Sequence, residues 1–176
     1  YTTLDGALQA EAETIVNEII PKDTELETAS FMLDVHSGAI LGLVGGRNYE
    51  KSEFNRVVQA ERMPGSSFKP ILYYSALESG YTPLTKLMSK PTAFLLNNGE
   101  VYAPSNFNHY YAYEPITLAQ AIALSDNVYA VKTNLELGVE RLVKTAKKFG
   151  FSGDFPAVPS LALGTATVTL KELVTA

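Results

Sequence analysis

Glu61-Arg62-Met63-Pro64-Gly65-Ser66-Ser67-Phe68-Lys69-Pro70 is the stretch around which the rest of the chain is organised. It places a serine hydroxyl and a lysine amine three residues apart, at Ser66 and Lys69. Proline is tolerated in the first turn of a helix, so Pro70 indicates that a helix begins close to Ser66. Residues at i and i+3 share one helix face, with β-carbons about 5 to 6 Å apart, so the amine can reach the hydroxyl. This spacing is typical of a nucleophile and its base.

The composition is that of a folded, slightly acidic chain. Of its 176 residues, 46% are hydrophobic, which is enough for one sizeable core or part of a larger one. The 14 basic and 19 acidic side chains include no basic cluster interleaved with aromatics, so we expect no nucleic-acid partner. Without cysteines, and with His36 and His109 as the only histidines, the chain cannot form thiolate or histidine-rich metal sites. We therefore expect no metal and no cofactor.

The first third of the chain predicts a helix followed by a β-hairpin. Apolar positions recur at steps of three and four, which predicts an amphipathic helix whose apolar face is Leu4, Leu8, Ala12, Ile15 and Ile19. Two apolar runs then flank His36-Ser37-Gly38, and glycine supplies the positive φ of a tight turn. The pattern predicts a sheet hairpin over about residues 31–44. No apolar run reaches the length of about 18 residues that spans a membrane, so any membrane anchor is expected outside these residues.

The middle of the chain predicts a buried helix and an irregular wall. The helix that starts near Ser66 continues through the apolar segment Ile71 to Leu77 and ends at Gly80, which predicts a nucleophile helix over about residues 66–79. A helix that is apolar on all sides is expected to be buried. Residues 82–115 are rich in Pro, Asn and Tyr, with a hairpin signal at Asn97-Asn98-Gly99.

A helical region is predicted over about residues 116–150. It opens with the capping box Thr117-Leu118-Ala119-Gln120 and is interrupted by Ser125-Asp126-Asn127, three residues that prefer caps and turns. The helical pattern resumes at Val128 and, after Gly138, a further amphipathic helix runs to Gly150. Another helical start lies near Thr169.

Two motifs carry the chemistry when they are taken together. S-x-x-K alone occurs often by chance, and Ser125-Asp126-Asn127 alone indicates a helix breaker that caps the next helix. In this order, however, they match two of the three motifs, S-x-x-K, S-D-N and K-T-G, that are found together in class A β-lactamases and penicillin-binding proteins.

The chain resembles the transpeptidase domain of a bifunctional, class A penicillin-binding protein over nearly its whole length. Beyond the two motifs, the resemblance is carried by Thr2-Thr3-Leu4-Asp5, Gly38-Ala39-Ile40, Gly45-Gly46, Phe54-Asn55-Arg56, Tyr102-x-Pro104-x-Asn106 and Leu163-Gly164-Thr165. It implies an α/β fold of the α+β type, similar to penicillin-binding proteins and β-lactamases. In this fold a five-stranded, mostly antiparallel sheet is flanked by helices, and the active site lies beside an all-helical subregion. Residues 1–176 would form the N-terminal part of one such domain.

The resemblance also implies a reaction. Ser66 would attack a D-Ala-D-Ala peptide bond of a peptidoglycan stem peptide and form an acyl-enzyme, and Lys69 would take the serine proton. Ser125 would relay a proton to the departing D-alanine, and Asn127 would hold the substrate amide or fix Lys69. An acceptor amine of a second stem peptide would resolve the ester, and β-lactams would act as covalent inhibitors. The site would lie on the extracytoplasmic face of the bacterial cell membrane.

One departure limits this expectation. The third motif, K-[ST]-G, is absent, since the only lysine after Lys148 is Lys171, which Glu172 follows. The resemblance places that motif downstream of Leu163-Gly164-Thr165, so we expect the chain to stop before it. The 176 residues alone would then lack a complete site and would not be stably acylated by labelled penicillin unless another chain supplied the remainder.

Several alternatives stay open. A β-lactamase or D,D-carboxypeptidase would use the same serine and lysine with a deacylating glutamate, for which Glu78, Glu100 and Glu114 are candidates. A non-enzymatic β-lactam sensor would carry the same acylatable serine joined to a membrane segment. His36 and His109 are predicted to be solvated loop residues rather than catalytic bases. An aromatic group could line a cleft or serve packing: Tyr102, Phe107, Tyr110, Tyr111 and Tyr113.

Overall fold

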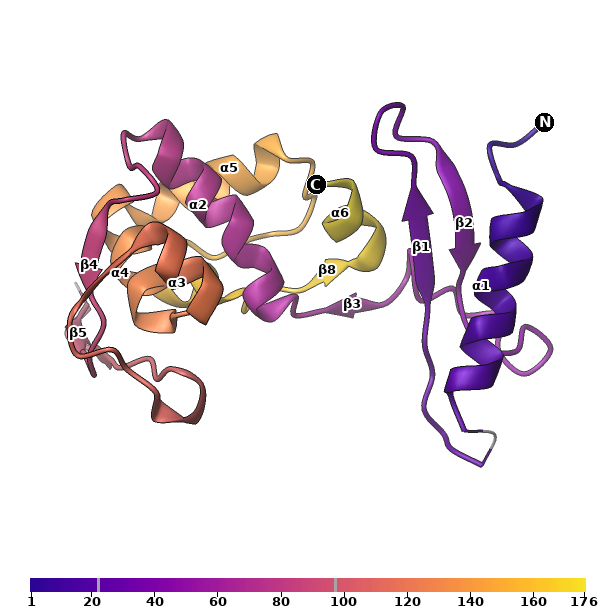
Figure 1. Cartoon of the computed structure of the whole chain (residues 1–176), viewed down its shortest axis with the longest axis horizontal. Coiled ribbons are helices and arrows are strands. Elements are labelled where there is room, and N and C mark those ends of the chain that lie inside the picture. The colour runs from indigo at the N-terminus through magenta and orange to yellow at the C-terminus, as the bar shows by residue number, and fades with distance from the viewer. Residues whose placement is uncertain (22, 97) are drawn as a thin grey trace. The chain divides into compact units, whose positions relative to one another are not determined.

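The computed structural model describes residues 1–21, 23–96 and 98–176, which form two compact units (Figure 1). The first unit comprises Tyr1–Arg62, Gly150–Ser152 and Thr167–Ala176, and the second comprises Met63–Phe149 and Gly153–Ala166. All residues predicted for the site, from Ser66 to Asn127, belong to the second unit. Among the described residues, no helix has both the length and the apolar character that crossing a bilayer requires.

The first unit has the predicted helix and hairpin. Helix α1 (Gly6–Ile19) packs against strand β2 (Ile40–Val44), which pairs antiparallel with β1 (Ser30–Leu33) (Figure 1). The carboxylate of Asp5 caps α1 by accepting hydrogen bonds from two N–H groups of its first turn. In the turn of the hairpin, the carboxylate of Asp34 accepts three hydrogen bonds from the two residues that follow Val35. That side chain therefore organises a turn for which the sequence had indicated only the glycine.

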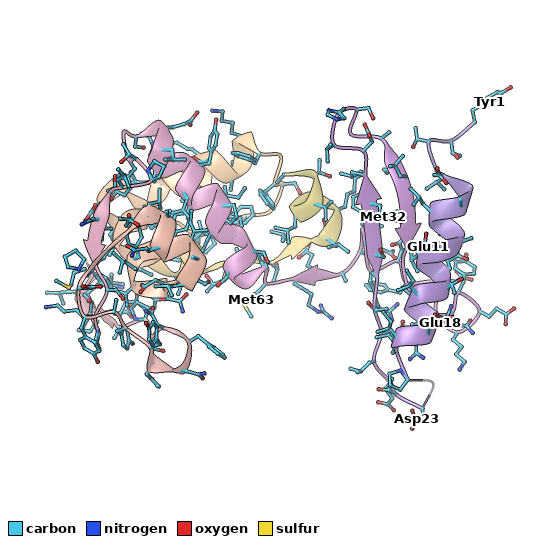
Figure 2. The ribbon with its side chains drawn as sticks, in the orientation of Figure 1. Tyr1, Glu11, Glu18, Asp23, Met32 and Met63 are labelled. Atoms are coloured by element: carbon cyan, nitrogen blue, oxygen red, sulfur yellow. The ribbon has the colours of Figure 1, made fainter. Side chains whose placement is uncertain are left out.

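The core between α1 and the hairpin is smaller than predicted. Ala12 and Val16 of α1 are buried with Val44, and Met32 packs against them. Figure 2 labels Met32 on β1. Of the predicted apolar face, only Ala12 is buried, and Ile15 is 44% exposed. The reason is geometric, since two strands about 4.8 Å apart are too narrow to cover the whole apolar stripe of a helix.

The rest of the first unit is a short strand pair with a helix. Strand β3 (Glu61–Arg62) pairs antiparallel with β8 (Val168–Thr169), which leads into α6 (Leu170–Thr175). A capping box between Thr169 and Glu172 begins this helix, near the predicted start.

Helices dominate the second unit. Helix α2 (Lys69–Glu78) packs against α4 (Asn127–Leu137) and α5 (Val139–Lys148), and the 3₁₀ helix η3 (Pro159–Leu163) also lies against α4. Helix α3 (Leu118–Leu124) begins with the predicted capping box. The helices pack around fully buried side chains: Phe68, Leu72, Ala76, Ala121, Val128, Tyr129, Val131, Ala146 and Leu161.

Short strands occupy the irregular segment. Strand β4 (Lys86–Met88) pairs with β7 (Pro115–Thr117), and β5 (Phe94–Leu95) pairs with β6 (Val101–Tyr102), both antiparallel. The β5–β6 pair is the predicted hairpin, although Asn97 of its turn lies outside the described residues. The 3₁₀ helix η2 (Phe107–His109) follows β6. The described residues thus form four two-stranded antiparallel sheets, and the pair of β1 and β2 is the predicted sheet hairpin.

The nucleophile helix differs from its prediction in two ways. It begins as a 3₁₀ turn, η1 (Gly65–Phe68), before α2 starts at Lys69. It is also buried on one side only, because Leu77 is 46% exposed and Tyr74 packs at the rim, edge-on to Phe149. The amphipathic helix α5 therefore covers α2 only in part.

Candidate active site

Ser66 lies in the 3₁₀ turn η1, directly before helix α2. Gly65 has φ +58°, a conformation that glycine adopts without strain, and this reverses the chain ahead of Ser66. Two residues later, the fully buried ring of Phe68 stacks on Phe155 with centroids 5.9 Å apart. Ser66 itself is exposed. The turn is thus anchored on both sides while the hydroxyl group stays accessible to a substrate.

Lys69 is the buried charge of the site. Only 3% of the residue is exposed. Its Nζ donates hydrogen bonds to the backbone oxygen of Ser125 (2.7 Å), to Ser125 Oγ (3.0 Å) and to Asn127 Oδ1 (2.7 Å). Burial lowers the pKa of Lys69 to about 8, against the opposing effect of the Asp126 carboxylate. The amine can therefore lose its proton near neutral pH, which an ordinary lysine does not do.

Among the described residues, the Ser125-Asp126-Asn127 turn supplies the three hydrogen-bond acceptors of that amine. Ser125 ends α3 in the left-handed conformation, with φ 50° and ψ 43°. Asp126 is the N-cap of α4, and its carboxylate accepts a hydrogen bond from the N–H of Tyr129 (2.7 Å). The helix junction predicted from sequence is therefore the feature that turns Ser125 and Asn127 toward Lys69.

Three residues were not predicted as part of the site, namely Asp126 in the turn and its partners Ser89 and Asn106. Asp126 is 2% exposed, and its Oδ2 accepts hydrogen bonds from Ser89 Oγ and from Asn106 Nδ2. Asn106 belongs to a segment that carried the resemblance, so its position was a signal, whereas nothing in the sequence singled out Ser89.

The structure brings together three of the four predicted site residues. Among the described residues, Lys69 Nζ has the three partners given above, and none of them is the Ser66 hydroxyl. The direct contact between Ser66 and Lys69 that the helix spacing predicts therefore stays a prediction. His36 and His109 are exposed, in the hairpin turn and in η2.

Two of the candidate deacylating glutamates have side-chain partners, whereas Glu114 is exposed. Glu78 forms an ion pair with Lys148 at 3.0 Å. Glu100 accepts a hydrogen bond from the side-chain amide of Asn98, and the backbone oxygen of Glu114 accepts one from the N–H of Ser89.

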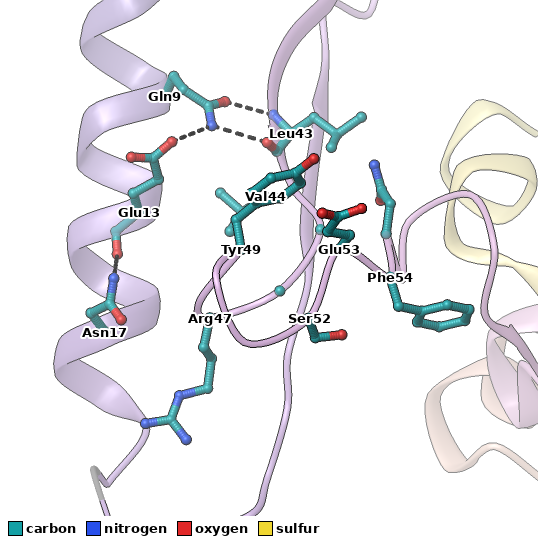
Figure 3. A pocket seen from close by; sticks show the side chains of 13 residues that line it. Gln9, Glu13, Asn17, Leu43, Val44, Arg47, Tyr49, Ser52, Glu53 and Phe54 are labelled. Carbon is teal, nitrogen blue, oxygen red and sulfur yellow. Dashed lines mark hydrogen bonds between the residues drawn. The ribbon is translucent and has the colours of Figure 1, made fainter.

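The first unit holds a pocket of about 460 Å³ between α1 and the segment that follows β2 (Figure 3). At its wall, the side-chain amide of Gln9 pairs with both backbone groups of Leu43, at 2.8 and 2.9 Å. None of the predicted site residues lines this pocket.

Comparison with known sequences identifies the family. The family model for the penicillin binding protein transpeptidase domain matches residues 28–160. Penicillin-binding protein 2D of Bacillus subtilis is 50% identical over the whole chain, and penicillin-binding protein 1A of Pseudomonas aeruginosa is 41% identical over 84% of it. The chain spans only 26% and 18%, respectively, of the length of these two relatives.

Comparison with solved structures agrees. Penicillin-binding protein 1A of Haemophilus influenzae matches 83% of the chain with a TM-score of 0.78 and 33% identity, and the match covers 22% of that protein. Penicillin-binding protein A of M. tuberculosis matches 98% of the chain with a TM-score of 0.81, covering 49% of that protein, and at 20% identity it supports the fold alone. Together with the family model, these matches establish that the chain belongs to the penicillin-binding protein transpeptidase domain family.

Proposed function

We propose that this chain carries the acylation machinery of a serine D,D-transpeptidase that cross-links peptidoglycan stem peptides. The single observation that carries the proposal is the buried amine of Lys69, held by Ser125 and Asn127 in the helix that begins beside Ser66. A desolvated lysine of this kind is a competent general base.

The proton inventory of the amine suggests how the site works. A lysine ammonium has three N–H donors, which match the three acceptors around Nζ. A neutral amine has two donors and one lone pair, so the Ser125 hydroxyl can turn and donate its proton to Nζ. Ser125 Oγ is therefore suited to pass a proton in either direction.

Acyl transfer then proceeds in two balanced steps. Ser66 Oγ forms an ester bond to the carbonyl carbon of the penultimate D-alanine, its proton goes to Lys69, and the C–N bond to the terminal D-alanine breaks. Ser125 passes a proton to the departing amine. An acceptor amine next attacks the ester and forms the cross-link, and its proton returns to Ser66 oxygen through the same groups.

The proposed setting follows from the relatives, which are named for penicillin binding. We place the working enzyme on the extracytoplasmic face of the bacterial cell membrane, anchored by a segment outside residues 1–176. Its substrates are the donor D-Ala-D-Ala stem peptide and the acceptor amine, and β-lactams acylate the same serine. No metal or cofactor takes part.

The test is labelling with a fluorescent penicillin. The protein is expressed from its gene with whatever sequence precedes residue 1 and follows residue 176, and the labelled peptide is identified by mass spectrometry. We expect the label on Ser66, its loss in Ser66→Ala, and its retention in the matched control Ser67→Ala, whose serine is exposed in the same turn. Label that survives Ser66→Ala would overturn the proposal. An ester that clears within seconds would favour a hydrolytic β-lactamase instead.

A further inference from the structure

The side chain of Asn106 uses all of its hydrogen-bonding capacity where solvent hardly reaches it. Asn106 is 8% exposed. Its Oδ1 accepts hydrogen bonds from the N–H groups of Asn127 (2.8 Å) and Val128 (3.2 Å). Its Nδ2 donates to the backbone oxygen of Tyr110 (3.0 Å) and to Asp126 Oδ2 (2.7 Å). An amide offers two donors and two lone pairs, so every one of them is occupied.

The acceptor side of this amide fixes the start of α4. The N–H groups of Asn127 and Val128 belong to the first turn of the helix, where the backbone has no intrahelical partner. By binding both, Asn106 sets the position of Asn127. Because Asn127 Oδ1 accepts a hydrogen bond from Lys69, the position of Asn127 also determines where this acceptor of the amine lies.

The donor side of the amide acts on a buried carboxylate. Asp126 receives hydrogen bonds from Asn106, from the fully buried Ser89 and from the N–H of Tyr129. All three donors are neutral groups. The described ion pairs do not include Asp126.

The anion at Asp126 faces groups from two helices. Its charge acts to raise the pKa of three neighbouring groups, Lys69 and Tyr73 of α2 and Lys132 of α4. At Lys69, burial lowers the pKa and the charge of Asp126 opposes that effect. The position of the Asp126 carboxylate therefore affects the amine of Lys69.

We propose that Asn106, together with Ser89, is a positioning residue for acyl transfer at Ser66, because it holds the buried Asp126 side chain and the Asn127 turn in place against Lys69. The inference rests on the proposed function, since Asn106 acts only through Lys69.

The variant Asn106→Asp gives this role a signature in pH. It places a carboxylate oxygen where an amide nitrogen now lies 2.7 Å from Asp126 Oδ2. Two carboxylates at that distance resist being ionised together, so at lower pH they share one proton, and the shared proton replaces the lost donor. As pH rises, this proton is lost and the two charges repel. The acylation rate of Asn106→Asp relative to wild type should therefore fall with rising pH.

The measurement is the second-order rate constant for acylation of Ser66 by fluorescent penicillin, from about pH 6 to pH 10. The protein again carries whatever sequence its gene adds around residues 1–176. Asn106→Ala should be slower by about tenfold to a hundredfold at every pH, because buried groups lose their partner without gaining a titratable one. The matched control is Asn134→Ala, which removes a fully buried asparagine of α4 that is bonded to the backbone oxygens of Val158 and Pro159. It should keep the wild-type rate and profile.

The outcomes separate the two proposals. A pH-independent ratio for Asn106→Asp, or an Asn106→Ala rate within about twofold of wild type, overturns the inference alone. If Asn106→Asp does not fold, Ser89→Ala decides. We expect it to slow the acylation step by about tenfold while leaving the affinity for penicillin before acylation unchanged, and an unchanged acylation step overturns the inference. A wild-type protein that takes no label on Ser66 overturns the proposed function, and the inference falls with it.

Discussion

Gly164 packs its α-carbon directly against the backbone of Gly65, the residue that precedes Ser66. The N–H of Gly65 donates a hydrogen bond to the oxygen of Gly164 (3.2 Å), and a β-carbon added to Gly164 would lie 2.2 Å from the oxygen of Gly65. Real β-carbons do not approach backbone this closely. The segment around Gly164 therefore fixes the position of the turn that holds Ser66.

Gly164→Ala should displace that turn. Alanine at φ +68° is strained by about 1 to 2 kcal/mol, and the clash with Gly65 adds to this cost. We expect lower thermal stability and slower acylation of Ser66. The control is Gly80→Ala, which has φ +96° but no atom within 4 Å of its added β-carbon. Gly80→Ala should lose only the stability that the strained backbone conformation costs. Equal losses of stability in the two variants would contradict a clash between the added β-carbon at position 164 and Gly65.

Acylation of Ser66 should rise with pH through about 8, the pKa to which burial lowers Lys69. The direction follows because the amine must be neutral to accept the serine proton. Lys69→Arg cannot be deprotonated and should slow acylation by about a hundredfold or more at all pH values. The check is a pH series of acylation rates, and a wild-type rate that falls between pH 7 and 9 would contradict it.

Asn127→Asp should move this profile to higher pH. The new carboxylate would lie where Oδ1 now accepts from Lys69 Nζ at 2.7 Å, and an anion so close raises a lysine pKa by about 1 to 3 units. The neutral fraction of Lys69 at pH 7 should fall by about tenfold or more and recover in alkaline buffer. Asn127→Ala is the control for the added charge, because it removes the hydrogen bond to Lys69 without adding a carboxylate. It should slow acylation without moving the pH profile to higher pH.

Glu172 should stabilise the first unit only above strongly acidic pH. Burial alone would raise its pKa, but hydrogen bonds from Ser152 and Thr169 lower it to about 2, from an ordinary 4.5. Between these values the unfolded chain binds more protons, so stability is lost as pH falls. Urea unfolding of wild type and Glu172→Gln should differ above pH 4.5 and converge near pH 2. A difference that persists at pH 2 would rule out the charge as its source.

The local pattern of residues predicted most of the helices and the main hairpin. The capping box at Thr117, the breaker at Ser125-Asp126-Asn127 and the stop at Gly138 each act within one turn of helix, so sequence alone reveals them. What could not be predicted are contacts between distant segments. Gly164 lies beside Gly65 across nearly a hundred residues, and no local periodicity records such an approach.

The candidate site divides in the same way. Ser66, Lys69, Ser125 and Asn127 follow from two short motifs. The residues that support them do not, since Ser89 and Asn106 lie far apart in the sequence from Asp126, whose buried carboxylate accepts a hydrogen bond from each. The prediction that α2 is buried on every side was wrong for a related reason. The neighbouring helices cover only part of its apolar surface, and Leu77 stays 46% exposed.

One of the hydrogen-bond acceptors of Lys69 is a backbone atom, which a side-chain substitution does not remove. The oxygen that accepts a hydrogen bond from Nζ at 2.7 Å belongs to the main chain of Ser125, which ends α3 in a left-handed conformation. Replacing the Ser125 side chain removes the hydroxyl but leaves that oxygen in place. The side chain at position 125 can therefore change while Lys69 keeps its hydrogen bond to the backbone. Only a change in the backbone conformation of residue 125 would remove that hydrogen bond.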